Sequence, residues 1–149
     1  MENEKIELSI GFPIYNGEKF LKNRLESILS QSFRKFELII SDNNSNDNTQ
    51  KICKEFLEKD SRIKYIKQEK NIEAKNNFKF VLSESIGKYF VWAAVDDIWE
   101  IEFLEKNIDF LEKNEKFVAS ISKVTRFGGD SKRFEDERQN IKKYYYKFR

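Results

Sequence analysis

Apolar residues follow two different spacings along this chain, and their alternation predicts the fold class. Short apolar runs typical of β-strands are separated by stretches in which apolar residues recur every three or four positions, as on one face of a helix. We expect strands at residues 6–12, 36–41, 63–66, 89–95 and 117–124. We expect helices at residues 21–29, 52–57, 74–85 and 104–111. This alternation favours right-handed crossovers, so the expected class is α/β, with a mostly parallel sheet between two helical layers.

The apolar run at residues 89–95 ends in two adjacent carboxylates, Asp96 and Asp97. Because nothing polar interrupts the run, we expect a strand that is buried on both faces. Ligands of open parallel sheets bind at the carboxyl ends of the strands, so the pair favours a cation, or a polyphosphate held through a cation. The alternative is a surface turn in which one carboxylate caps the next helix, but it leaves the second carboxylate unexplained.

Length, charge and hydropathy bound the organisation of the chain. Its 149 residues suit one domain, and its net charge of +2 comes from interleaved acidic and basic residues, which does not indicate a nucleic-acid partner. The periodic pattern predicts a domain over residues 1–124 and a charged, tyrosine-rich tail over residues 125–149 that is disordered or truncated. No apolar run approaches the ~20 residues of a transmembrane segment, and the polar N-terminus does not resemble a signal peptide, so we expect a cytoplasmic location.

Histidine is absent and Cys53 is the only cysteine. The chain therefore cannot form an internal disulfide, and a zinc site has almost no ligands to draw on, so any metal is expected to be a hard cation bound by oxygen. The absence of histidine also removes the commonest general base, which leaves Asp, Glu, Lys, Tyr or the single Cys for proton transfer.

The first strand and its turn fit neither the glycine-rich turn of a dinucleotide-binding domain nor a P-loop. Gly11 and Gly17 are separated by bulky residues, and no Gly-Lys-Ser or Gly-Lys-Thr sequence exists. The remaining possibility is a base held by side chains, with the phosphates held through a metal. Tyr15 can offer an aromatic face to a base, and Asp42 can accept a hydrogen bond from a base N–H. Each residue also has a structural interpretation: Tyr15 as an aromatic side chain packed in a loop, and Asp42 as a helix cap.

Four motifs along the first 120 residues or so resemble the successive signatures of family-2 inverting glycosyltransferases. They lie at residues 13–17, 25–31, 41–47 and 87–99. The resemblance implies the GT-A fold, here incomplete at the C-terminus, and a nucleotide-sugar donor, which we expect to be a UDP-sugar. It also implies Mn²⁺ or Mg²⁺ as cofactor, a glycan or lipid-linked acceptor, a role in polysaccharide biosynthesis, and a peripheral position at the inner face of the membrane.

The resemblance also implies roles for individual residues. Tyr15 would line the base pocket, Asp42 would bind the base, and Asp96 with Asp97 would hold the ribose and the metal-diphosphate. Lys75 or Asn76 would lie in the segment that faces the donor. The nucleotide-binding residues are then Pro13, Tyr15, Asp42, Lys75 and Asp96, and the metal ligands are Asp96 and Asp97.

The chain departs from the family pattern at several places. Glu73 stands where the family commonly has glycine, and Ala94 stands where another Asp often precedes the acidic pair. Family members continue into a second half that supplies the acceptor site and the catalytic carboxylate. Residues 135–137 (Glu-Asp-Glu) superficially resemble the later acidic motif, but they follow Asp97 too closely, so we expect the catalytic base to be absent.

Three functional hypotheses stay open at this point. The first is the donor half of a glycosyltransferase whose activity needs further sequence. The second is a module that binds a nucleotide sugar or a nucleotide, with a partner chain supplying acceptor and base. The third, an interaction protein that uses its tyrosine-rich tail, is weakest because the tail is short and carries acids as well as bases.

Overall fold

The computed structural model describes residues 5–122, so the tail at residues 125–149, with its acidic stretch at 135–137, lies outside the described residues. Strands and helices alternate throughout the described part. The strands are β1 (Leu8–Ile14), β2 (Phe36–Asp42), β3 (Ile63–Lys67) and β4 (Tyr89–Trp92). The helices are α1 (Glu18–Leu29), α2 (Thr49–Leu57), α3 (Ala74–Ser83) and α4 (Phe103–Lys113). Within these residues, no helix is long and apolar enough to cross a membrane.

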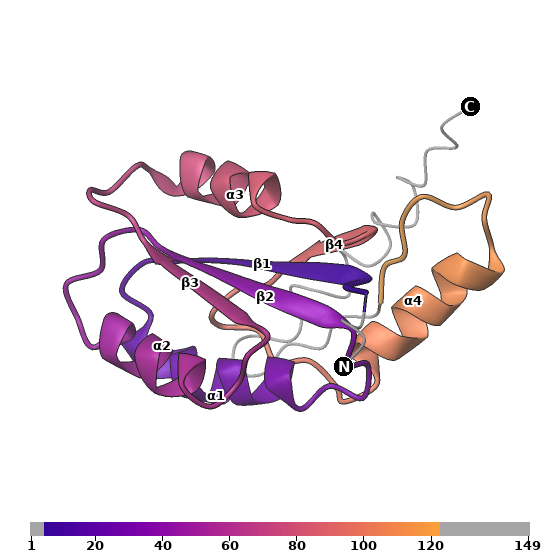
Figure 1. The fold of residues 1–149 in the computed structure, drawn as a ribbon, viewed down its shortest axis with the longest axis horizontal. Coiled ribbons are helices and arrows are strands. Elements are labelled where there is room, and N and C mark those ends of the chain that lie inside the picture. Colours follow the sequence, from indigo (N-terminus) through magenta and orange to yellow (C-terminus); the bar gives the residue numbers. More distant parts are fainter. Residues whose placement is uncertain (1–4, 123–149) are drawn as a thin grey trace, which may run out of the picture.

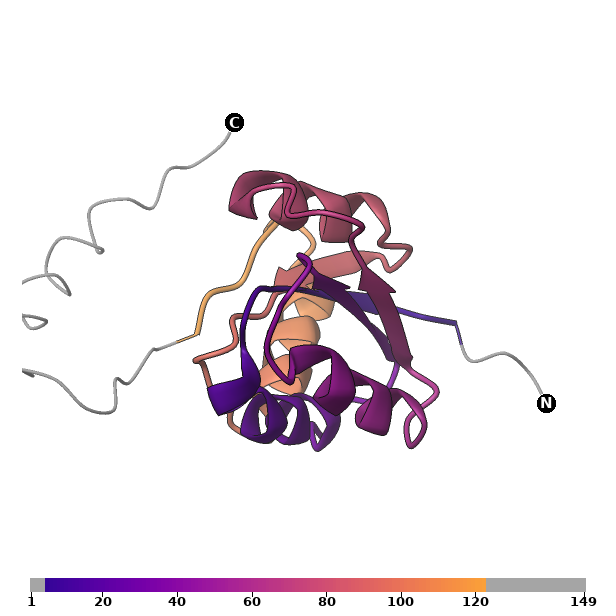
Figure 2. The same cartoon turned by 90° about the vertical axis from the view of Figure 1, so that its left-hand side faces the viewer.

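The four strands form one parallel sheet in the order β3-β2-β1-β4. Helices α1 and α2 cover one face of this sheet and α3 covers the other, as the two perpendicular views show (Figures 1 and 2). The expected α/β class and the three-layer arrangement are therefore confirmed.

The alternation of side chains along β1 separates the two layers. Leu8, Ile10, Phe12 and Ile14 are buried in the core on the side of α1. On the other face, Gly11 lies so close to α3 that an added Cβ would come within 2.8 Å of Val81 Cγ2. Glycine at this position therefore allows the helix to approach the sheet.

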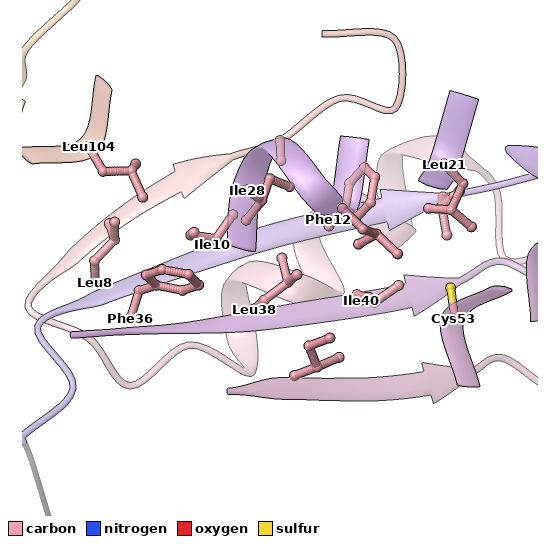
Figure 3. Packing of buried hydrophobic residues seen from close by; sticks show 14 of the residues in the cluster. Leu8, Ile10, Phe12, Leu21, Ile28, Phe36, Leu38, Ile40, Cys53 and Leu104 are labelled. Atoms are coloured by element: carbon pink, nitrogen blue, oxygen red, sulfur yellow. The ribbon is translucent and has the colours of Figure 1, made fainter. Parts of the chain in front are cut away.

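The main core lies between the sheet and α1, α2 and α4. Figure 3 shows apolar side chains of β1 and β2 meeting Leu21 and Ile28 of α1 and Cys53 of α2. Leu104 of α4 closes this core beside Leu8. Burial of these side chains stabilises the fold by roughly 1.5–3 kcal/mol for each large apolar residue.

The expectation of a long strand buried on both faces after residue 88 is wrong. β4 ends at Trp92 rather than at residue 95, lies at the edge of the four-stranded sheet, and is only half-buried, with Trp92 47% exposed. Its apolar character has another cause: Tyr89 and Val91 pack against the main core, whereas Phe90 lies against Gly11 on the α3 side. Both faces of β4 are thus contacted, but its lateral edge is not paired within the described residues.

A fifth strand was also expected at residues 117–124. The described part of that range, residues 117–122, contains no strand. Phe117 instead packs against Phe110 of α4, with ring centroids 5.4 Å apart. The apolar residues of this range therefore serve local packing on α4 where the structure describes them.

Candidate functional site

The carboxyl ends of β1 and β2 lie side by side, because Ile14 is paired with Asp42 in the sheet register. The loops that follow these strands meet the beginning of α3 and enclose a pocket of about 230 Å³. Its lining combines apolar, aromatic and carboxamide side chains: Pro13, Ile14, Tyr15, Asn43, Asn71, Ala74, Asn77 and Phe78. This mixture is typical of a small-molecule site, where apolar walls carry a few directed polar groups.

Asn43 ties the wall of this pocket together. Its Oδ1 accepts a hydrogen bond from the backbone N–H of Ile72 (2.8 Å), and its Nδ2 donates to Asn71 Oδ1 (3.1 Å). The segment before α3 is thereby fixed against the end of β2. The sequence analysis assigned no role to Asn43, although this residue lies in the motif at residues 41–47.

Asp42, which was expected to bind the base, lies behind the pocket wall. It is fully buried and is not among the lining residues. Its Oδ1 accepts from the backbone N–H of Ser45 (2.8 Å), and its Oδ2 accepts from the Tyr65 hydroxyl (2.9 Å). Burial and the Asp42 carboxylate raise the pKa of Tyr65, so this phenol remains a donor. In this structure Asp42 organises the loop after β2.

Tyr15 was expected to face the base, and it lines the pocket with 51% of its surface exposed. The turn that follows it is held by the loop after β2. The N–H of Asn16 donates to Ser45 Oγ (2.9 Å), and the N–H of Gly17 donates to Thr49 Oγ1 (2.9 Å). The Tyr15 backbone is therefore fixed beside the pocket while its ring remains accessible.

Asp96 and Asp97 lie in the loop after β4, on the same edge of the sheet as the pocket, and both are exposed. No cluster of three or more His, Cys, Asp or Glu side chains that could hold a metal exists within residues 5–122. Two adjacent carboxylates nevertheless fit Mg²⁺ or Mn²⁺, which commonly takes one or two carboxylates and completes its coordination with substrate phosphates and water. The donor set of this chain is thus compatible with a metal that arrives with a diphosphate.

The remaining expected residues are also at this edge. Lys75 is exposed in the first turn of α3, next to the pocket residue Ala74.

Cys53 is buried on α2, and burial raises the pKa of its thiol to about 12. It therefore stays protonated at neutral pH, which excludes it as a nucleophile or base in the folded protein.

Comparison with known proteins identifies the family. The model named "Glycosyl transferase family 2" matches residues 9–149. The chain belongs to glycosyl transferase family 2. Its fold agrees with this assignment, because residues 1–349 of S. aureus TarS in complex with UDP match with a TM-score of 0.68 and 26% identity, over 73% of this chain and 33% of that TarS chain.

Curated relatives of family 2 are similar over much of the sequence. An uncharacterized glycosyltransferase from Methanocaldococcus jannaschii is 33% identical over 98% of this chain and 53% of its own length. The Escherichia coli protein named UDP-Glc:alpha-D-GlcNAc-diphosphoundecaprenol beta-1,3-glucosyltransferase WfgD is 34% identical over 68% of this chain and 39% of its own length. The chain spans about half or less of the length of these relatives.

The family motif at residues 25–31 has a structural explanation. Ser27 Oγ donates to the carbonyl oxygen of Trp99 (3.1 Å) and accepts from the N–H of Trp99 (2.9 Å). Gln31 Nε2 donates to the carbonyl of Glu100 (2.8 Å), and its Oε1 accepts from the N–H of Leu104 (3.1 Å). These bonds fasten the loop that carries the acidic pair to α1.

Glu73, which replaces the glycine common in family 2, keeps a backbone conformation that suits glycine. Its φ is 69° and its ψ is 152°. The turn before α3 is held by Asn71, whose Oδ1 accepts from the N–H of Glu73 (2.9 Å). This turn therefore holds a non-glycine residue in a conformation that suits glycine, under backbone strain.

Proposed function

We propose that this chain forms the donor-binding half of a glycosyltransferase that uses a nucleotide-diphosphate sugar, most simply a UDP-sugar. The observation that carries the proposal is the presence of an aromatic and carboxamide pocket and an exposed carboxylate pair on one edge of a parallel sheet. S. aureus TarS binds UDP and UDP-GlcNAc in its crystal structures, and the name of WfgD specifies UDP-Glc, which supports uridine as the nucleoside.

In this proposal the base occupies the pocket between Tyr15 and the carboxamides. The exposed ring of Tyr15 stacks on the base. Asn43 and Asn71 carry both donors and acceptors, which can pair with the N3–H and carbonyl oxygens of uracil. Asn43 lines the pocket whereas Asp42 does not, so Asn43 takes over the base-binding role expected for Asp42. Its carboxamide already bonds Ile72 and Asn71, and it would pair with the base through its second N–H and the second lone pair of Oδ1.

The diphosphate then lies between α3 and the acidic loop. Lys75, in the first turn of α3, offers a positive charge at a helix N-terminus, where anions are favoured. Asp96 and Asp97 hold Mn²⁺ or Mg²⁺, and Asp96 also contacts the ribose. The metal supplies positive charge that stabilises the departing diphosphate.

An inverting transfer also needs a base and an acceptor site, and none of residues 5–122 is assigned to either. We therefore propose that the chain as given binds the donor but transfers sugar slowly, since positioned proton transfer alone contributes about 10² to 10⁴ in rate. The acceptor is a glycan or a lipid-linked glycan, in keeping with the undecaprenol-linked substrate in the name of WfgD. A lipid-linked acceptor would place the complete protein peripherally at the inner face of the membrane.

The base pocket is tested by calorimetric titration with UDP in the presence of Mn²⁺. Asn43→Ala removes the proposed contact and should weaken UDP binding about 3- to 10-fold, the range for one neutral hydrogen bond. Tyr65→Phe is the matched control, because it perturbs Asp42 behind the wall and should lower stability without a comparable loss of UDP affinity. Unchanged affinity in Asn43→Ala, together with lost affinity in a folded Asp42→Asn variant, would return the base contact to Asp42.

A further inference from the structure

Arg24 carries a buried charge that has no role in the donor site described so far. It lies on the core face of α1, between Leu21 and Ile28, with only 1% of its surface exposed. Its Nε, Nη1 and Nη2 atoms are buried and have no hydrogen-bond partner. A guanidinium has five N–H donors, and a buried charge without compensation is strongly unfavourable.

The surroundings of Arg24 connect it to the acidic loop. Its guanidinium carbon lies 4.1 Å from the centroid of the Trp99 ring, which gives a cation–π contact. The backbone of Trp99 is bonded to Ser27, one helical turn from Arg24, so the loop is held directly over this charge. Asp97 and Asp96 precede Trp99 by two and three residues.

Arg24 remains charged in this setting. Burial lowers its pKa to about 10, and the negative charges of Asp97 and Asp96 oppose that shift. No direct ion pair of 4.0 Å or less joins Arg24 to either carboxylate in the described part of the chain. Because no ion pair with Arg24 occupies them, the oxygens of Asp96 and Asp97 remain available to a ligand.

We propose that Arg24 is the fixed counter-charge of Asp96 and Asp97 and sets which ions this acidic pair accepts. The inference rests on the proposed donor site. A cation behind two carboxylates weakens their attraction for a free divalent metal ion and offsets their repulsion of a diphosphate. The site is thereby biased towards a diphosphate that arrives with its metal, and against metal alone.

This role differs measurably from a purely structural one. If Arg24 only supported the loop, its removal would weaken metal and nucleotide binding together. If Arg24 acts by its charge, its removal should tighten the binding of the metal and weaken the binding of the nucleotide. Burial makes the effect larger than for a surface lysine, whose charge is screened by water and salt.

The test uses the 149-residue chain and measures each ligand alone. Mn²⁺ is titrated without nucleotide by electron paramagnetic resonance, and UDP is titrated by calorimetry in EDTA. Arg24→Met should tighten Mn²⁺ binding and weaken UDP binding, each roughly 3- to 10-fold, as expected for one unit charge near a partly exposed site. Lys22→Met is the matched control, because it removes the same charge from the exposed face of α1 and should change either affinity less than about 2-fold.

Further variants keep the result interpretable. Arg24→Lys retains the charge and should therefore leave the affinities for Mn²⁺ and for UDP close to those of the wild type. Urea unfolding checks the fold, which should be unimpaired or stabilised, since an apolar side chain often replaces a buried ion without loss. If Arg24→Met does not fold, Arg24→Gln is measured in the same way with the same expected signs.

The outcomes separate this inference from the proposed function. Opposite shifts for Mn²⁺ and UDP support the counter-charge. Joint weakening, unchanged affinities, or equal effects of Arg24→Met and Lys22→Met overturn it while leaving the donor site standing. Failure of the wild-type chain to bind UDP even with Mn²⁺ would overturn the proposed function, and this inference with it.

Discussion

Glu73 occupies a backbone conformation that suits glycine, so Glu73→Gly is expected to stabilise the fold. With φ at 69° and ψ at 152°, the residue lies where L side chains are strained. Holding a non-glycine residue in such a region costs on the order of 1–3 kcal/mol. Glycine also increases the entropy of the unfolded chain, which offsets about 0.4–1 kcal/mol of the gain. The net stabilisation should therefore be about 0.5–2 kcal/mol.

The side chain of Glu73 contributes little that glycine would lose. It is exposed, and the hydrogen bonds of Glu73 come from its backbone: the N–H donates to Asn71 Oδ1 at 2.9 Å, and the carbonyl oxygen accepts from the N–H of Asn77 at 3.1 Å. Glycine keeps that N–H and its bond. The expected change thus isolates the strain of one backbone position.

Urea and thermal unfolding of the two chains measure this change. The midpoint of thermal unfolding should rise by about 2–6 °C for a domain of this size. Glu73→Ala is the matched control, because it removes the same carboxylate but keeps the Cβ, and it should give no gain. Equal stabilisation by alanine and glycine would attribute the effect to charge, and destabilisation by glycine would refute the strain argument.

Three further substitutions probe the elements that position the site. Tyr65→Phe removes a donor from the buried Asp42 carboxylate and should lower the free energy of unfolding by about 1–3 kcal/mol, measured in urea. Gly11→Ala places a Cβ 2.6 Å from Phe90 Cζ and should cost about 1–3 kcal/mol in the same assay; a neutral result would show that the α3 layer shifts freely. Ser27→Ala removes both bonds to the Trp99 backbone and should weaken Mn²⁺-dependent UDP binding in calorimetry more than Ser30→Ala, which changes the exposed residue that follows α1.

The parallel core of the fold could be predicted from sequence because its patterns are local. The strand at Phe36–Asp42 and the helix at Ala74–Ser83 agree with the expected ranges within two residues. The edge position of β4 could not be predicted. An apolar run indicates that both faces of a strand are contacted, but it does not indicate whether further strands pair with its two edges. Strand order depends on contacts between segments far apart in the sequence.

The sequence predicted the edge of the sheet that holds the candidate site more accurately than the individual residues that line the pocket. Tyr15 lines the pocket and the acidic pair is exposed at the same edge, while their expected roles in binding the base, the ribose and the metal stay predictions. Asp42 proved to be buried, and the alternation of β2 contained the signal: it shares its side of the strand with the core residues Leu38 and Ile40. Asn43, one residue later, points away from that core and into the pocket wall.

The counter-charge role proposed for Arg24 could not be predicted from the sequence. Its spacing on α1 places it among apolar core positions, where a charged residue is unexpected. Only the fold shows that Trp99, 75 residues later in the chain, covers its guanidinium. Through-space electrostatics of this kind depend on tertiary contacts and are not visible in local patterns.

The central claim is that the pocket and the acidic pair form one donor-diphosphate site. Calorimetric titration of the wild-type chain and of Asp97→Ala with UDP, each with and without Mn²⁺, tests it most directly. We expect saturable UDP binding at one site, which Mn²⁺ tightens in the wild type, and loss of the Mn²⁺ effect in Asp97→Ala. Absence of UDP binding, or an equal response to Mn²⁺ in both proteins, would contradict it.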